Sequence, residues 1–145
     1  MTKEKASWWM SRYCRLRDAI KYCKGRGVNL GQFVRPEDII AQCCSCNTVK
    51  SWYRLQGGHY FGRGLGGGSG AYFDERNVYA QCCRCNAFLG GNFREYQDYM
   101  HDLYGPGITE ELRIIHKSYS QPEPSVIGAY YEQQYGELVK GLNGS

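Results

Sequence analysis

The chain opens with a segment in which apolar residues recur every three or four positions. From residue 6 to about residue 24 this spacing is sustained, while Lys and Arg occupy the remaining positions. Gly25 and Gly27 follow, and glycines at this point indicate the end of a helix. The pattern predicts an amphipathic helix with a basic surface. Its apolar positions are Trp9, Tyr13, Leu16, Ile20 and Cys23.

From Val34 onward the apolar runs become short and irregular. Residues 52–55 and 59–61 are rich in aromatic side chains and predict two short strands. The glycine-rich segment 62–70 that follows is incompatible with regular structure. It also lacks the Gly-Lys-Ser/Thr ending of a nucleotide-binding P-loop, so we reject that function.

Helical spacing returns in the last third of the chain. Residues 86–104 predict a helix that Gly90 and Gly91 interrupt. A second helix is expected from Thr109, as its N-cap, to about residue 118, and a final helix spans 125–142. We therefore expect an α+β fold. Its segments would be an N-terminal basic amphipathic helix (1–33), a core (34–107) and C-terminal helices (108–145).

Composition narrows the class of protein only slightly. A chain of 145 residues corresponds to about one domain. The net charge of +4 is compatible with nucleic-acid binding but is not diagnostic of it. No apolar run approaches the roughly 20 residues of a membrane span, and no apolar leader follows Met1. We expect no membrane partner and a cytoplasmic location.

The cysteines give the most specific signal. The phrase Gln-Cys-Cys-x-Cys-Asn occurs twice, beginning at Gln42 and at Gln81. Each copy contains a Cys-x-x-Cys, and two such turns can supply the four thiolates of a closed tetrahedral zinc site. Adjacent cysteines fit poorly with a disulfide framework. The expected structural Zn²⁺ ligands are Cys43, Cys46, Cys82 and Cys85.

The insert between the two turns carries side chains suited to phosphodiester hydrolysis. Hydrolysis needs a group that deprotonates water, and His59 has a suitable intrinsic pKa. It also needs a divalent ion held by oxygen atoms, such as Mg²⁺ or Mn²⁺. Zinc held by four thiolates has no open position. A catalytic ion must therefore bind elsewhere in the chain.

The order of these motifs resembles the NinG/Rap recombination nucleases of lambdoid phages over about residues 40–105. More widely, it is similar to the HNH, or ββα-metal, nucleases, including phage endonuclease VII. The matching elements are Cys43/Cys46, Gly58-His59-Tyr60, Phe73-Asp74-Glu75-Arg76-Asn77, Gln81-Cys82 to Cys85-Asn86, Gly91-Asn92 and Tyr96. The resemblance implies a small zinc-stapled ββα-metal (HNH-like) core with flanking N- and C-terminal helices.

The same resemblance implies roles for three residues. His59 would be the general base, Asn77 would brace the loop and orient His59, and Asn86 would be a ligand of the catalytic ion. Gly58 departs from the pattern, because HNH enzymes commonly carry a metal-binding His or Asp at that position. Asp74 and Glu75 are the nearest acidic candidates for the missing ligand. Gln56, Asp98 and His101 remain alternatives.

We therefore expect a metal-dependent DNA endonuclease that cleaves branched recombination intermediates, such as Holliday junctions and D-loops, in the cytoplasm of a phage-infected host. Expected partners are branched DNA, a second copy of the chain in a homodimer, and recombination proteins. The alternative is a non-catalytic zinc module that binds DNA or a recombinase. The expected phosphate contacts are Arg12, Arg15, Arg63 and Arg76.

Overall fold

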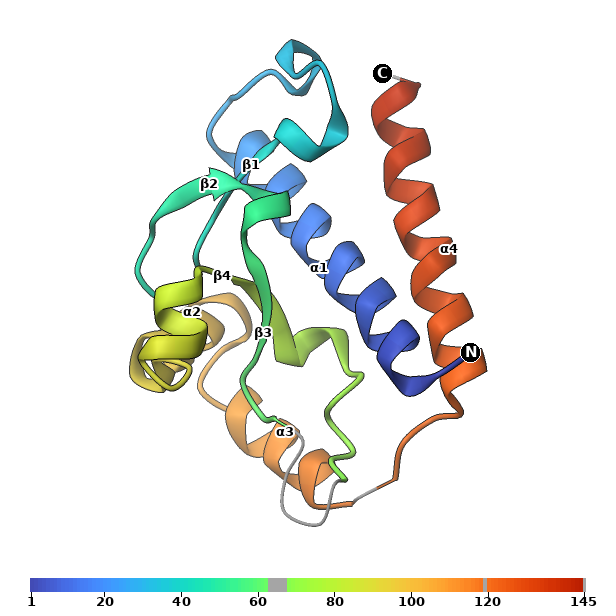
Figure 1. Ribbon diagram of the computed structural model, residues 1–145. Coiled ribbons are helices and arrows are strands. Elements are labelled where there is room, and N and C mark those ends of the chain that lie inside the picture. Colours follow the sequence, from blue (N-terminus) through green and yellow to red (C-terminus); the bar gives the residue numbers. More distant parts are fainter. Residues whose placement is uncertain (63–67, 119, 145) are drawn as a thin grey trace.

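The computed structural model describes residues 1–62, 68–118 and 120–144, and has a mixed α+β fold (Figure 1). Arg63 and most of the glycine-rich segment lie outside the described residues. Four α-helices accompany two antiparallel two-stranded sheets in the described part of the chain. The elements are α1 (Lys3–Gly25), β1 (Ile40–Gln42), β2 (Val49–Ser51), β3 (Gln56–His59), β4 (Val78–Gln81), α2 (Phe93–Tyr104), α3 (Ile108–Lys117) and α4 (Pro124–Asn143).

Helices α1 and α4 lie side by side and run in the same direction (Figure 1). The amino group of Met1 donates to Ser125 Oγ, and farther along the pair Arg12 donates to Tyr135 Oη. Both helices occur where the apolar spacing predicted them. Tyr131 is the buried tyrosine of α4, while Tyr130 faces outward.

The hydrophobic cores cross the expected segment boundaries. One core combines Leu16 of α1, Trp52, Ala80 of β4 and partly buried side chains of α4 such as Leu138. A second joins α1 to Tyr72 and Tyr131. The ranges 1–33, 34–107 and 108–145 are thus packed together by shared cores.

Three local predictions were wrong. Trp52–Arg54 forms a 3₁₀ turn instead of a strand, because the Trp52 indole donates to Pro36 O and Arg15 donates to the carbonyl groups of the turn. The strand expected at 59–61 instead spans Gln56–His59, so Tyr60 and Phe61 lie beyond its end. Helix α3 begins after Gly107, and the Thr109 hydroxyl is hydrogen-bonded to His101 Nε2 instead of capping the helix.

The outer edge of β4 is covered by side chains of α1. Arg17 donates to Val78 O at 2.6 Å, and Asp18 Oδ2 accepts from Ala80 N at 2.7 Å. Arg17 and Asp18 also pair with each other at 2.9 Å. The two residues satisfy backbone groups that a two-stranded sheet would leave unpaired at its edge. Part of the basic surface expected on this helix is therefore used inside the fold.

None of the helices in the described ranges has the length and apolar character needed to cross a membrane.

Candidate functional site

The four expected cysteines form one cluster. Cys43 and Cys46 lie at the turn after β1, and Cys82 and Cys85 lie directly after β4. Their Sγ atoms all lie within 4.8 Å of one another, and the Cys46–Cys82 pair is 3.6 Å apart. A tetrahedral zinc ion with Zn–S bonds of about 2.3 Å sets sulfur atoms about 3.8 Å apart. The cluster could therefore hold a structural metal ion such as zinc.

Hydrogen-bond donors surround these sulfur atoms. Ser45 N donates to Cys43 Sγ, Cys85 N to Cys82 Sγ, and the Asn92 side chain to Cys85 Sγ. Such donors favour the thiolate form, which is the form that binds metal. Hydrogen bonds from Thr48 and from the neighbouring thiols outweigh burial at Cys46 and lower its pKa to about 6, whereas burial raises the pKa of Cys43 and that of Cys85.

The remaining cysteines stay outside this cluster. Cys14, Cys23 and Cys44 are buried, and Cys83 is exposed. Burial is the main reason that the pKa of Cys14 rises to about 12 and that of Cys44 rises further. These three buried thiols act as small apolar groups in the cores.

Strands β3 and β4 form a hairpin that leads through the second cysteine turn into α2 (Figure 1). His59, the last residue of β3, is opposite Val78, the first residue of β4. The buried hydroxyl of Tyr96 on α2 donates to Gly58 O at 2.6 Å and lies 3.3 Å from Asn77 O. Tyr96 thus fixes the helix to the end of the hairpin that carries His59.

The position of His59 is defined by Tyr72. The two rings are stacked, with centroids 4.1 Å apart and planes inclined by 18°. His59 Nε2 lies 3.0 Å from the Tyr72 carbonyl oxygen. A carbonyl oxygen only accepts hydrogen bonds, so Nε2 carries the proton and neutral His59 has its basic lone pair on Nδ1.

Asn77 connects the two chain segments on which His59 and Tyr72 are carried. Its side chain is completely buried. Asn77 Oδ1 accepts from Phe61 N at 2.8 Å, and Nδ2 donates to Phe61 O and to Ala71 O. Phe61 follows His59 by two residues, and Ala71 directly precedes Tyr72. These bonds connect the two chain segments, and the role of Asn77 in orienting His59 stays a prediction.

His59 and Asn86 line the same open cleft of about 320 Å³. The other lining residues are Gly57, Gly62, Tyr72, Gly90, Gly91 and Phe93. Asn86 belongs to the turn Arg84–Phe88, and its Nδ2 donates to Gln56 Oε1 at 2.6 Å. The side-chain amide of Asn86 is therefore held in place by the first residue of β3.

Asp74 and Glu75 are not among the residues that line this cleft. Asp74 accepts from Arg76 N and forms a two-bond ion pair with the Arg76 guanidinium. Burial acts to raise the pKa of Asp74, but the bonds to Arg76 outweigh it and lower that pKa. Glu75 lines a different cleft, beside Arg17 and Tyr79. The structure does not bring these two carboxylates to His59.

Gly58 cannot carry a side chain in this backbone arrangement. A Cβ atom at this position would lie 2.1 Å from Gln81 Oε1, inside contact distance. Gln81 is completely buried, and its Nε2 donates to Ser45 Oγ at 2.9 Å and to Gly91 O at 2.6 Å. The space that a metal-binding His or Asp would use at position 58 is thus filled by Gln81.

The expected phosphate-binding arginines make contacts within the protein. Arg12 donates to Tyr135 and lies over the rings of Trp8 and Trp52. Arg15 donates to the carbonyl oxygens of Trp52, Tyr53 and Leu55. Burial and the neighbouring charge of Arg12 lower the pKa of Arg15 to about 10.

Arg76 bridges Asp74 to Glu111 of α3, with a distance of 2.8 Å to each partner. Arg76 is thus engaged in ion pairs within the protein. DNA contacts by these arginines stay predictions.

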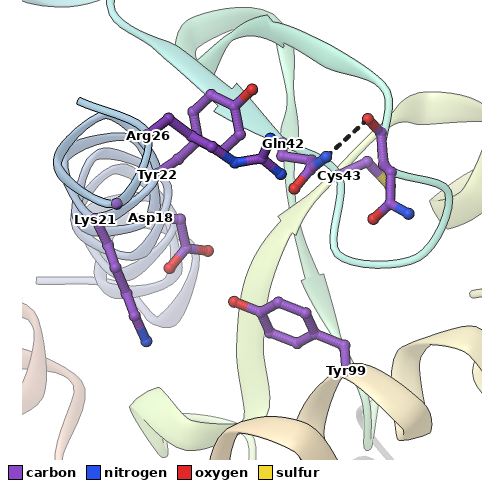
Figure 2. Close-up of a pocket in the computed structure, with 9 residues that line it drawn as sticks. Asp18, Lys21, Tyr22, Arg26, Gln42, Cys43 and Tyr99 are labelled. Carbon is purple, nitrogen blue, oxygen red and sulfur yellow. Dashed lines mark hydrogen bonds between the residues drawn. The ribbon is translucent and has the colours of Figure 1, made fainter. Parts of the chain in front are cut away.

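A second cleft of about 240 Å³ lies between the C-terminal end of α1, the first cysteine turn and α2 (Figure 2). Figure 2 shows Tyr22 and Arg26 near Gln42 at one end and Tyr99 at the other. Gln42 Nε2 donates to Asn47 O at 3.2 Å, which closes the first cysteine turn. This cleft shares no lining residue with the cleft that contains His59.

Sequence reasoning missed two residues of the site, Tyr72 and Gln81. Gln81 had a usable signal, because a glutamine precedes the first cysteine in both copies of the repeated phrase. In both copies its amide donates to a backbone carbonyl farther along, Asn47 O for Gln42 and Gly91 O for Gln81. Tyr72 had no local signal, since its role depends on contact with His59 across the intervening loop.

Comparisons with known proteins identify the family of the chain. No curated protein and no solved structure shows significant similarity to it. The family described as Bacteriophage Lambda NinG protein matches residues 1–140. The match is thus longer than the expected range of 40–105 and includes α1, α3 and most of α4. A match over nearly the whole sequence means that this chain belongs to the bacteriophage lambda NinG family.

Proposed function

We propose that this chain is a metal-dependent DNA endonuclease of the HNH, or ββα-metal, type that cuts branched recombination intermediates in the host cytoplasm. One observation carries the proposal: His59 and Asn86 line one cleft, on a hairpin and a turn that the four-cysteine cluster holds together. A binding module has no evident need for a histidine oriented in this way in the cleft that Asn86 also lines.

In this proposal His59 acts as the general base. Its Nε2–H is fixed to the Tyr72 carbonyl, so Nδ1 accepts the proton of the attacking water. The imidazolium that forms keeps its hydrogen bond to that carbonyl and lies over the face of the Tyr72 ring, which favours a cation. Tyr72 thereby stabilises the charged form of the base during the reaction.

Asn86 would hold the catalytic Mg²⁺ or Mn²⁺ through its amide oxygen. The donor type fits, because these ions prefer hard oxygen ligands. Mg²⁺ also retains several waters and uses phosphate oxygens of the substrate, so a single protein oxygen can contribute to such a site. The ion would supply charge neutralisation at the scissile phosphate and leaving oxygen.

The second candidate function is a non-catalytic zinc module that binds DNA or a recombinase. It is favoured by the lack of a carboxylate among the described residues that line the His59 cleft. Under this alternative His59 and Asn77 would only maintain the loop. Cleavage activity separates the two functions, since a binding module would show none.

The decisive experiment incubates purified protein with end-labelled linear, flap, D-loop and four-way DNA, with Mg²⁺, with Mn²⁺ and with neither ion, and without a chelator that would also remove structural zinc. We expect cleavage of branched substrates that requires the divalent ion. His59→Ala should reduce the rate by about 10²–10⁴-fold through loss of the base. His101→Ala is the matched control, because His101 is bonded to Thr109 away from the cleft. Equal rates for folded His59→Ala and wild type would contradict the proposal.

A homodimer and recombination proteins remain proposed partners. A four-way junction has two symmetry-related scissile strands, so a two-fold symmetric dimer would match it. Sedimentation of the protein with and without four-way DNA tests this proposal. A monomer on the junction at saturating protein would contradict it.

A further inference from the structure

The segment 88–93 exposes apolar side chains at the edge of the His59 cleft. Phe88 is 79% exposed, and Leu89 and Phe93 are each 49% exposed. Neither Phe88 nor Leu89 belongs to any of the three described cores. Consecutive exposed apolar side chains beside a functional cleft indicate a contact surface, whereas isolated ones are ordinary.

This segment is held firmly by the second cysteine turn. Leu89 N donates to Arg84 O at 2.8 Å, and Gly91 N donates to Cys85 O at 2.9 Å. From the other side, Gln81 donates to Gly91 O at 2.6 Å. These bonds fix the backbone on both sides of Phe88 and Leu89. The outward position of the two side chains is therefore built into the turn.

Backbone conformation supports the same conclusion. Gly90, Gly91 and Asn92 have positive φ values of 61°, 99° and 47°. Three successive residues in this region turn the chain sharply; glycine adopts such φ values without strain, and asparagine tolerates them better than most other residues. A Cβ at Gly91 would also lie 3.0 Å from the Phe93 ring. Phe93 in turn packs edge-on against Tyr60, with centroids 5.5 Å apart, and forms the base of the turn.

The exposed arginines near this surface, and its position beside the His59 cleft, indicate that its binding partner is DNA. Arg84 and Arg94 are exposed on either side of the apolar pair, where they can meet phosphate groups. Gly90, Gly91 and Phe93 line the cleft together with His59, so the surface is continuous with the site proposed for phosphodiester cleavage. A DNA strand in that cleft would bring its bases next to Phe88 and Leu89.

We propose that Phe88 and Leu89 form an apolar wedge that inserts between bases at the branch point of the DNA. The proposal rests on the proposed nuclease function and adds the element that selects the branch. Inserting a side chain into a stacked duplex costs several kcal/mol of stacking energy. The cost is smaller where stacking is already interrupted, as at a junction or a flap. The wedge therefore distinguishes branched DNA from linear duplex by the interrupted base stacking at the branch, and not by base sequence.

The test uses four-way and linear DNA that carry 2-aminopurine next to the branch point, or at the matching linear position, in buffer without Mg²⁺ or Mn²⁺ so that cleavage does not occur while structural zinc is retained. Wild-type protein should increase 2-aminopurine fluorescence in the four-way DNA, because the base loses its stacking partner. The double variant Phe88→Ser/Leu89→Ser should abolish that increase. It should also lower the preference for four-way over linear DNA by at least about tenfold, since withdrawing even one of two buried apolar side chains has an effect of about that size.

Two controls keep the result specific. Ile114→Ser and Val126→Ser alter apolar residues that are 65% and 66% exposed and lie outside the cleft, and they should leave both readings unchanged. Phe88→Leu keeps an apolar wedge and should retain most of the fluorescence increase. Zinc content and circular dichroism establish that each variant is folded.

The outcomes distinguish this proposal from the function on which it rests. If wild-type protein cuts branched DNA but leaves 2-aminopurine unchanged, the wedge is overturned and the nuclease function stands. If wild type neither binds nor cuts branched DNA, both are overturned. A wild-type dimer that becomes monomeric in the double variant, with DNA preference unchanged, would assign the surface to a second copy of the chain and overturn the wedge.

Discussion

The imidazole ring of His59 lies flat against the phenol ring of Tyr72, 4.1 Å between centroids, and also donates from Nε2 to the carbonyl oxygen of that residue. One residue thus determines both the plane of the imidazole and the nitrogen that carries its proton. The two residues are joined by the loop 60–71, and Asn77 is hydrogen-bonded near both ends of that loop, to Phe61 N and to Ala71 O.

Tyr72→Ala should reduce the cleavage rate by about 10–100-fold, the usual effect of removing a group that orients a functional side chain. The carbonyl oxygen of residue 72 remains, but the ring no longer fixes the imidazole. Tyr72→Phe is the matched variant, because it keeps the ring and loses only the hydroxyl that is bonded to Ser7. Single-turnover rates on four-way DNA check this prediction. A rate for Tyr72→Ala equal to that of Tyr72→Phe would contradict it.

Asn77→Ala should lower the free energy of unfolding by about 3 kcal/mol. The substitution removes the partners of Phe61 N, Phe61 O and Ala71 O, and each buried polar group without a partner costs about 1–3 kcal/mol. Cleavage should fall as well, because the two ends of the loop separate. Urea denaturation of zinc-loaded protein measures the first effect. Unfolding midpoints that coincide with those of wild type would show that Asn77 is not a brace.

Asn86→Ala should change the metal dependence of the reaction in addition to its rate. An oxygen ligand is removed, so a higher Mg²⁺ concentration should be needed to reach half-maximal cleavage. His59→Ala should reduce the rate without this shift, because Nδ1 acts on water in the proposed mechanism. Cleavage rates titrated against Mg²⁺ for both variants test the difference. Identical half-saturating concentrations for Asn86→Ala and wild type would exclude Asn86 as a ligand.

Replacing Cys46 or Cys82 by Ser should release the metal and unfold most of the domain. Structural zinc contributes on the order of 10 kcal/mol of folding free energy, similar to the whole stability of a small domain. Cys83→Ser is the control, because Cys83 is exposed and outside the cluster. We expect one zinc per chain in wild type and in Cys83→Ser by elemental analysis. Folded wild-type protein without zinc would be evidence against the site.

Gly58→Ala should destabilise the protein by about 1–3 kcal/mol, the range for forcing an extra group into a packed site. Its Cβ would meet Gln81 Oε1, whose side chain is held by Ser45 and Gly91. Gly62→Ala is the matched control, since no atom lies within 4 Å of a Cβ there. Thermal unfolding of both variants provides the measurement, and equal midpoints would show that Gln81 moves aside easily.

Sequence by itself determined the two long helices and the four cysteines of the cluster. The apolar spacing located α1 and α4 within a few residues, because a helix that packs on a core repeats its apolar positions along the chain. The two Cys-x-x-Cys turns identified all four members of the cluster. In both cases the information lies within a few neighbouring residues.

Only the tertiary structure decided which polar groups meet. Asp74 and Glu75 are close to Asn77 in sequence. In the structure, however, Asp74 forms an ion pair with Arg76, and Glu75 lines a separate cleft. Arg12 and Arg15 looked like surface cations, and the packing of α1 directs them onto aromatic rings and backbone carbonyls. Contacts between side chains of distant segments depend on how the helices and strands pack. A local sequence pattern does not specify that packing.

The same reason explains His59. The intrinsic pKa of an imidazole and the order of the surrounding motifs identified a candidate base, whereas its contacts come from Tyr72 across the loop, whose ends are bonded to Asn77. Gln81 fills the space beside Gly58. The two residues are far apart in sequence, because Gly58 is in β3 and Gln81 is the last residue of β4. Sequence named the reactive groups because their chemistry belongs to the residue itself. Their geometry is a property of long-range contacts, and only the folded chain sets those contacts.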